Sequence, residues 1–503
     1  MRETTEFLNE RYNKNNEYVF WIYFYRQLFS CSAALLNSFF FGVFTGAPTV
    51  IVPQMRIEAN STDVATPEMV SWLSSIAAYS AIPWAFILPM IAYRFGRKIS
   101  LILICVNVLV GNTIFYYSTS VTELIISQAA LGMLVSSALT ITVMVMSEYT
   151  SPKYRGIFLT LKGATFYWGV WVSNAIGTFF HWRNIGVLVF ICGIYNLISC
   201  IFCYESPYWL ATKGHFEECA KVHRWLKGTD EISEEELRKL ISSQEQHFKT
   251  KLNNKIKYSK STKILNVLKC KGFYKPLVFA SLPLLLYNLS GKIACSVYAI
   301  DIIKKITSSE RVAYEGMLIL DAVTVIGMYL GCALSKIITR RKQLLFFSSA
   351  GVVFLYVLST YLYMIKLNVI SENNYVSLFF LMGYSISISC GPMILATCCS
   401  AELSPLRYRS YFVCCLGLVA DIVFATTLKI SPLVFRFWGT HGAFLFYAVL
   451  ASVLVYLIYK YVPETKDKTI QEIQELITGV QKNATVKMEL VPLKKPEAAL
   501  NFS

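Results

Sequence analysis

The chain has 503 residues, of which 55% are hydrophobic and only 16% are charged, and its formal net charge is +16. A soluble protein carries about 25% charged residues, so this composition argues against a soluble globular fold. The basic excess lies in polar segments between apolar ones, which indicates loops beside an anionic membrane leaflet rather than a nucleic-acid partner.

Apolar runs follow one another along the chain, and each is about as long as the 20 residues that cross a bilayer as a helix. Helices are expected because lipid offers no hydrogen-bond partner to an open strand edge. The sequence therefore predicts an all-α membrane protein with twelve transmembrane helices. The runs lie at 29–52, 71–92, 99–118, 124–146, 157–180, 184–203, 275–299, 313–335, 343–365, 376–400, 411–434 and 441–461.

The polar segments divide the chain into two six-helix halves, 29–203 and 275–461, joined by a helical linker, 204–274. The linker is rich in Lys and Arg, a bias that marks the cytosolic side of a membrane. Because an even number of spans returns the chain to the same side, the tails 1–28 and 462–503 are expected in the cytosol as well.

A possible glycosylation signal lies in the first predicted outward loop. The triplet Asn60-Ser61-Thr62 fits the acceptor pattern of N-glycosylation. We expect Asn60 to be exposed there.

The fourteen cysteines fall almost entirely in apolar spans, where they are expected to pack as small polarisable side chains. His215, Cys219 and His223 share one helix face in the linker, but three ligands without a fourth are a weak zinc signal. No metal or cofactor is therefore predicted. The sequence also lacks a phosphate-binding glycine loop and a nucleophile elbow, so no enzyme is predicted.

Two charged segments, SEYTSPKYRGIF after the fourth run and AELSPLRYRSYF after the tenth, are nearly the same. Glu148 precedes Arg155 by the same spacing as Glu402 precedes Arg409. A cassette repeated half a chain length away indicates duplicated halves.

Two further pairs of segments accompany the repeat. PMIAYRFGRK matches GCALSKIITRRK in the loops after the second and eighth runs, and YESPYWL and VPETKDKT follow the sixth and twelfth. Together these motifs resemble those of the sugar porters of the major facilitator superfamily, over about residues 25–480. TPEMVSWLSSI and YRQ are similar to the insect trehalose-transporter-like branch. The resemblance implies a twelve-helix bundle that carries sugar by alternating access.

By this resemblance, the cytosolic loops hold two clusters of carboxylates and guanidinium groups that act as latches during the transport cycle. Such pairs are directional and can still break. The alternative is that they are solvated loop charges beside the helix ends. The first cluster is Arg97, Glu148, Arg155 and Glu205, and the second is Arg340, Glu402, Arg409 and Glu464.

The sugar-binding residues of the family are mostly replaced. Its QQLSGIN-type run on the seventh span reads YNLSGKI here, and Gly163 stands where the family has a sugar-binding Gln on the fifth span. The expected hinge of the tenth span, Gly391 and Pro392, is retained. Other side chains could supply the lost hydrogen bonds, although each could equally serve helix packing. These candidates are Asn288, Ser290, Tyr298, Thr324 and Thr397.

Lys162, Lys292, Asp321 and Asp421 fall at membrane depth, where a charge is costly and points to function. Lys292 lies in the run that resembles the substrate site and is added to the candidates; it could pair with Asp321 or Asp421. Such a pair could be structural, or the charges could serve an anionic or polar non-sugar substrate.

Proton-driven sugar porters carry an Asp on the first span, where this chain has Phe44. The resemblance therefore implies a plasma-membrane uniporter of hexose or trehalose type, although the intramembrane Asp residues leave proton coupling open. Two alternatives remain: a carrier of a non-sugar polar or anionic solute, and a non-transporting membrane sensor of the same fold. Oligomeric state is not predicted.

Overall fold

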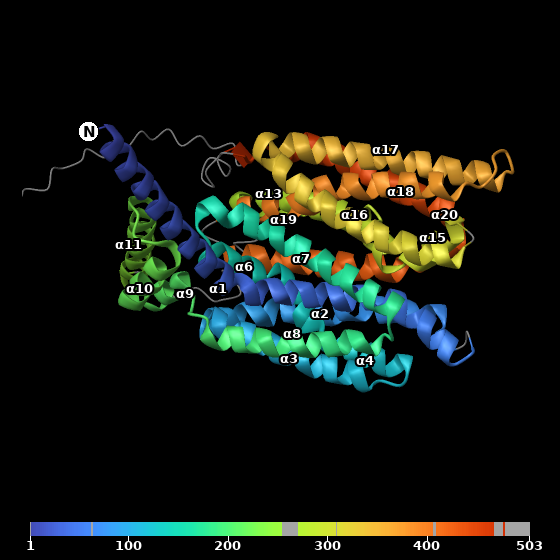
Figure 1. Ribbon diagram of the computed structural model, residues 1–503, viewed down its shortest axis with the longest axis horizontal. Helices are drawn as coiled ribbons and strands as arrows, with labels where there is room; N and C mark the ends of the chain where they lie inside the picture. Colours follow the sequence, from blue (N-terminus) through green and yellow to red (C-terminus); the bar gives the residue numbers. More distant parts are fainter. Residues whose placement is uncertain are drawn as a thin grey trace, which may run out of the picture.

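The computed structural model describes residues 2–61, 64–253, 270–307, 309–405, 409–466 and 476–477, which form helices and connecting turns without a strand. The helices of the two halves lie side by side, and a small group of helices, α9–α11, stands at one end of the bundle (Figure 1). We call this end the linker end and the opposite one the far end.

The first half begins with one long helix and is interrupted in its fourth span by two short breaks. Its helices are α1 (Arg2–Glu58), α2 (Pro67–Phe95), α3 (Arg97–Tyr117), α4 (Val121–Ala130), α5 (Gly132–Leu139), α6 (Ile141–Tyr149), α7 (Pro152–Phe179) and α8 (Arg183–Phe202). The linker contributes α9 (Pro207–Lys213), α10 (Phe216–Lys227) and α11 (Glu231–Asn253).

The second half is interrupted in its first and fourth spans. Its helices are α13 (Lys271–Leu289), α14 (Lys292–Val297), α15 (Ala299–Thr307), α16 (Glu310–Ile337), α17 (Arg340–Lys366), α18 (Asn374–Ile388), the π-helix η1 (Ser389–Met393), α19 (Ile394–Glu402) and α20 (Arg409–Tyr461). The predicted hinge residues Gly391 and Pro392 lie in η1, where proline cannot donate the usual helical hydrogen bond.

Local sequence explains several helix starts. Ser120 and Glu123 form a reciprocal capping box at α4, and Ser206 accepts a hydrogen bond from the backbone N–H of Trp209 at the start of α9. These side chains satisfy N–H groups that have no partner within the helix.

Nine helices in the described residues are long and apolar enough to cross a membrane, and the bent pair α4 and α5 adds a tenth. α20 is counted once, although its backbone leaves the helical conformation at Gly439 and it contains both of the last predicted runs. α7, with 28 residues, occupies the position of the fifth run. The bundle therefore accommodates all twelve predicted spans.

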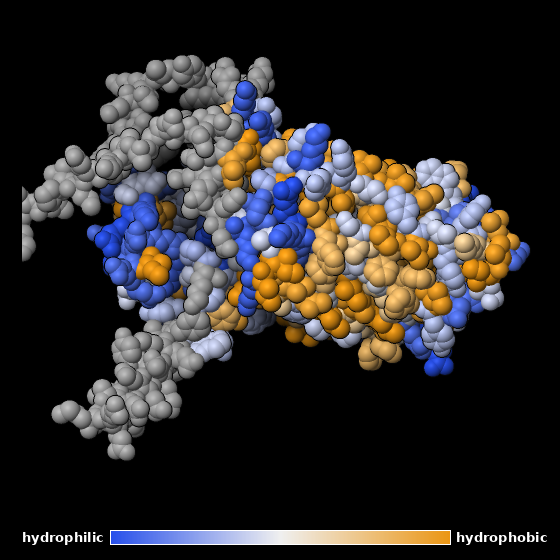
Figure 2. Space-filling view, turned by 90° about the horizontal axis from the view of Figure 1, so that it is seen from above, coloured by the Kyte–Doolittle hydropathy of each residue, from blue (hydrophilic) through white to orange (hydrophobic). Residues whose placement is uncertain are grey.

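On the face shown in Figure 2, the surface of the bundle is mainly apolar over its middle, and hydrophilic side chains gather toward its ends. Large hydrophobic side chains such as Ile191, Phe346 and Phe379 are each more than 60% exposed. A continuous apolar surface over the middle of the bundle would be unfavourable in water. We therefore expect this surface to face lipid. Asn60, at the far end, is exposed, while Thr62 of its sequon and most of the tail 462–503 lie outside the described residues.

Candidate functional site

The first charge cluster lies at the linker end of the first half. The Arg97 guanidinium donates two hydrogen bonds to Glu148, from Nη2 to Oε1 at 2.7 Å and from Nε to Oε2 at 2.8 Å. Both side chains are about 5% exposed. The Ser206 hydroxyl donates to the same carboxylate at 2.5 Å. This two-point pairing of a buried arginine is the strong form of the interaction.

Glu205 belongs to the same cluster but binds backbone rather than guanidinium. Its carboxylate accepts hydrogen bonds from the backbone N–H groups of Arg97 at 2.8 Å and Lys98 at 3.2 Å, at the start of α3. Burial raises the pKa of Glu205, and these backbone hydrogen bonds oppose the rise. The carboxylate thus caps a helix N-terminus, where negative charge is favoured.

The second half repeats this arrangement. Arg340 forms an ion pair with Glu402, and Glu464 accepts hydrogen bonds from the backbone N–H groups of Arg340 at 3.2 Å and Arg341 at 3.0 Å. Burial raises the pKa of Glu464, but its backbone hydrogen bonds prevail and the pKa lies below its usual value. The repeat in the sequence is therefore a repeat in contacts, and the hydrogen bonds and ion pairs described above each join elements of one half.

The structure describes the two remaining cluster residues, Arg155 and Arg409, to different extents. Arg155 lies in the first turn of α7, and its charge acts on Lys227 of α10. Arg409 begins α20, and its side chain lies outside the described part of the molecule.

A cavity of about 110 Å³ lies between the two halves. Its walls come from α1, α5 and α7 on one side and from α13, α16, η1, α19 and α20 on the other. Four sequence candidates face it: Lys162, Asn288, Thr397 and Asp421. Most of the other walls are apolar, with Phe41, Phe166, Phe424, Met328 and Met393 among them.

Lys292 lies beside this cavity rather than in its lining, and it forms neither of the two ion pairs considered for it, with Asp321 or with Asp421. Its ammonium group, fully buried, donates to the hydroxyls of Thr324 at 2.7 Å and Ser385 at 2.8 Å. Asp321, one helical turn from Thr324 on α16, accepts from the amide of Asn174 at 2.7 Å instead. The ion pair is replaced because hydroxyls of α16 and α18 lie nearer to the ammonium group.

Ser290 and Tyr298 also lie outside the cavity lining. Ser290 ends α13, and its carbonyl accepts from the Tyr384 hydroxyl at 2.7 Å. The Tyr298 hydroxyl donates to the carbonyl of Leu428 at 3.0 Å, toward the far end.

The two halves contact each other at the far end. The Thr49 hydroxyl donates to the carbonyl of Val297 at 2.6 Å, and the Ser71 hydroxyl to that of Lys429 at 3.0 Å. The Lys429 ammonium also lies 3.8 Å from the ring centre of Trp72. These contacts bring the two halves together beyond the cavity.

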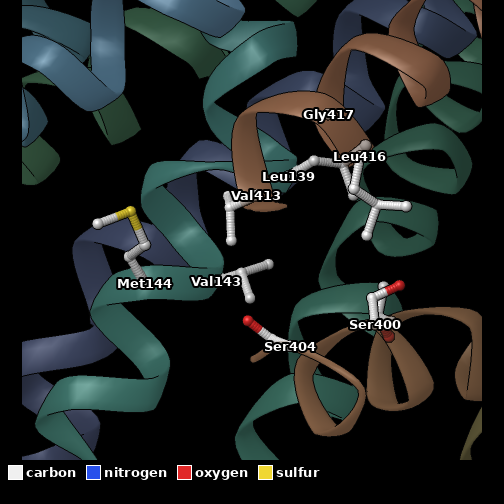
Figure 3. A pocket seen from close by; sticks show the side chains of 9 residues that line it. Leu139, Val143, Met144, Ser400, Ser404, Val413, Leu416 and Gly417 are labelled. Atoms are coloured by element: carbon white, nitrogen blue, oxygen red, sulfur yellow. The ribbon is translucent and has the colours of Figure 1, made fainter. Parts of the chain in front are cut away.

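A smaller apolar pocket of about 30 Å³ also lies between the halves and shares Leu139 and Thr397 with the lining of the main cavity. Val143 and Met144 of α6 approach it from one side, and Ser404, Val413 and Leu416 from the other (Figure 3). The central cavity is thus bordered by a narrow apolar region where the two halves meet.

Among the contacts between the halves that sequence reasoning missed, two lie near the cavity. Asn174 meets Asp321, and the hydroxyls of Tyr167 and Tyr287 lie 2.9 Å apart. A single Asn or Tyr in an apolar span carries no periodic signal, so only the tertiary arrangement reveals its partner.

Comparisons with known proteins agree with this architecture. The sequence pattern of the family described as "Sugar (and other) transporter" matches residues 28–477. The chain is 25% identical over 483 residues to the facilitated trehalose transporter Tret1 of Apis mellifera ligustica, covering 93% of this chain and 91% of that one. With Tret1 of Polypedilum vanderplanki the identity is 24%, covering 94% and 92%.

Among solved structures, the fold is similar to that of the major facilitator superfamily proton:xylose symporter XylE bound to 6-bromo-6-deoxy-D-glucose. The TM-score is 0.73 and the identity 17%, over 90% of this chain and 98% of that chain. The fold is thus the all-α membrane bundle of that superfamily. The chain belongs to the sugar (and other) transporter family.

Proposed function

We propose that the protein is a facilitative carrier that moves a sugar of hexose or trehalose type across the plasma membrane by alternating access. The observation that carries the proposal is the cavity between the two halves, because a site between rocking halves can open to either side in turn. The curated relatives named as facilitated trehalose transporters support the substrate class. The linker end and both tails are proposed to face the cytosol.

In this cycle each charge cluster is proposed to act as a latch by fixing the helix ends of its own half at the linker end, rather than by pairing across the halves, and the η1 turn with Gly391 and Pro392 serves as a hinge. Asn288 and Thr397 are the polar, uncharged candidates that face the cavity and would contact the solute. A cavity of roughly 150 Å³ accepts a group the size of benzene, so the cavity must widen before it admits a disaccharide.

A carrier of a charged or polar non-sugar solute is the second candidate. It is favoured by one observation: the cavity lining contains Lys162 and Asp421 but only a single amide side chain, Asn288. A site that recognises sugar hydroxyls uses several directional hydrogen bonds.

Uptake of labelled trehalose and labelled glucose by cells that express the chain tests the proposal. We expect saturable uptake that falls at least severalfold in Arg340→Ala, which removes the ion pair with Glu402, when the variant is measured at equal amounts of folded protein at the cell surface. Arg311→Ala, which removes an exposed pair on α16, is the matched control. Absence of uptake by protein shown to be at the cell surface would reject the sugar assignment.

Facilitated diffusion predicts that uptake does not depend on a proton gradient. A protonophore, or a change of external pH from 7.5 to 6, should leave the initial rate of sugar uptake within about twofold. Loss of accumulation with the protonophore would show proton coupling instead, with Asp321 and Asp421 as the first residues to test.

A further inference from the structure

Two ionisable side chains face the central cavity from opposite walls. Lys162 lies on α7 of the first half and Asp421 on α20 of the second, and both belong to the cavity lining. Their residues are 6% and 3% exposed, respectively. The cavity therefore has a cationic group on one wall and a carboxyl group on the other.

These two groups lack the partners that the neighbouring buried charges have. Lys292 is held by two hydroxyls and Asp321 by Asn174. Asp421 Oδ2 has no hydrogen-bond partner in the described part of the chain, and no ion pair there joins Asp421 to Lys162. Asp321 Oδ1 is likewise without a partner in the described residues, but Asp321 does not line the cavity. Lys162 and Asp421 are therefore the basic and the acidic side chain of the cavity lining, and no ion pair among the described residues satisfies them.

The rest of the cavity lining does not supply opposite charges to Lys162 and Asp421. Aromatic and methionine side chains, including Phe41, Phe424 and Met328, cover much of the wall between the two groups. A buried ionised group is unfavourable unless an opposite charge and hydrogen bonds accompany it. A solute with a single charge would satisfy one wall and leave the other unpaired.

We propose that the central cavity binds a small zwitterion, with its carboxylate at Lys162, its ammonium group at Asp421 and its apolar chain against the aromatic and methionine side chains. The two groups lie on opposite walls and form no ion pair with each other, so a ligand that reaches both carries its two charges on different ends, and a linear ω-amino acid is the simplest probe of this kind. The inference rests on the proposal that this cavity is the transport path, and it adds a ligand class to that path.

Binding of labelled 5-aminopentanoate to the purified full-length chain in nanodiscs tests the assignment. We expect saturable binding that pentanoate and pentylamine, which each retain one charge, displace at least tenfold more weakly than the unlabelled zwitterion. Equal displacement by either singly charged analogue, or no saturable binding, would overturn it.

Charge variants test the two contacts and control for folding. Lys162→Met and Asp421→Asn should each weaken binding by at least about tenfold, as loss of one partner of a buried charge pair does. The double variant Lys162→Asp with Asp421→Lys restores one charge of each sign, and a zwitterion can turn round. We expect it to recover affinity to within a few fold, whereas Lys162→Asp alone should not bind.

A double variant that elutes as monodisperse protein with a wild-type melting temperature but does not bind would contradict the assignment. If the double variant does not fold, the singly substituted Lys162→Met and Asp421→Asn decide, since unchanged affinity in both would overturn it equally.

Sugar uptake is measured in parallel. Sugar uptake without zwitterion binding rejects only this inference, and zwitterion binding without uptake of any solute rejects only the proposed function.

Discussion

Gly96 separates α2 from α3 and determines whether Glu205 can reach the start of α3. Its φ of +106° lies in a region that favours glycine, and a Cβ atom there would lie 2.1 Å from Glu205 Oε2. The glycine of the sequence motif FGRK is therefore explained by the backbone conformation and by the position of Glu205. Glycine permits both the turn and the approach of the carboxylate.

Replacing Gly96 by Ala is expected to destabilise the protein by about 1–3 kcal/mol through backbone strain alone, with further loss from the displaced carboxylate. Gly156→Ala is the matched control, because a Cβ atom there would meet nothing within 4 Å and alanine favours a helix. Thermal unfolding of both purified variants checks this. Equal melting temperatures would refute the role of Gly96.

The buried pair of Arg97 and Glu148 is expected to matter more for stability than an exposed pair. Arg97→Ala leaves Glu148 buried without its partner, which costs roughly 3–5 kcal/mol. Arg311→Ala removes an exposed pair with Glu315 and should cost about 0–1 kcal/mol. Comparison of the two variants by thermal unfolding in one detergent measures the difference, and a larger loss in Arg311→Ala would contradict the structure.

At the scale of elements, the linker helices bury a titratable histidine. His223 of α10 is 1% exposed, and its ring lies 3.9 Å from Glu236 of α11. Burial, together with the nearby charge of Lys227, lowers its pKa to about 4. The unfolded linker therefore binds a proton near pH 6.5, where the folded one does not.

This shift makes the linker sensitive to acid. Its stabilisation is fully present above pH 6.5 and should be lost as the pH falls from 6.5 toward 4, because the unfolded state then binds more protons. Hydrogen exchange of α10 at pH 7 and pH 5 measures the effect. His223→Gln should reduce the difference between the two conditions, and an undiminished difference would assign the sensitivity to another group.

Interrupted spans show where sequence prediction ends at this scale. The length of an apolar run predicts a span because the helix must be long enough to cross the hydrocarbon core of the bilayer. It does not predict that α13 ends at Ser290, where Gly291 adopts a φ of +86° and a Cβ atom would lie 2.7 Å from the Tyr447 ring. That break depends on a residue on the last span, more than a hundred positions away.

At the scale of the molecule, the repeated motifs predicted both the pairing of halves and the paired charge clusters. The motifs did not predict the side-chain contacts inside the bundle. An ion pair of Lys292 with Asp321 or Asp421 was one possibility, but its ammonium group donates to the hydroxyls of Thr324 and Ser385. The cavity-facing charges Lys162 and Asp421 were recognised as unusual from their depth in the spans, whereas their common cavity follows only from how the halves meet.

Alternating access is the central claim, and locking the far end tests it most directly. Thr49 and Val297 belong to different halves and are joined by a 2.6 Å hydrogen bond. In the variant Thr49→Cys with Val297→Cys, oxidative cross-linking should abolish sugar uptake, and reduction should restore it, while each single Cys variant should be unaffected by the oxidant. Full uptake by cross-linked protein would contradict a cycle in which the halves separate at the far end.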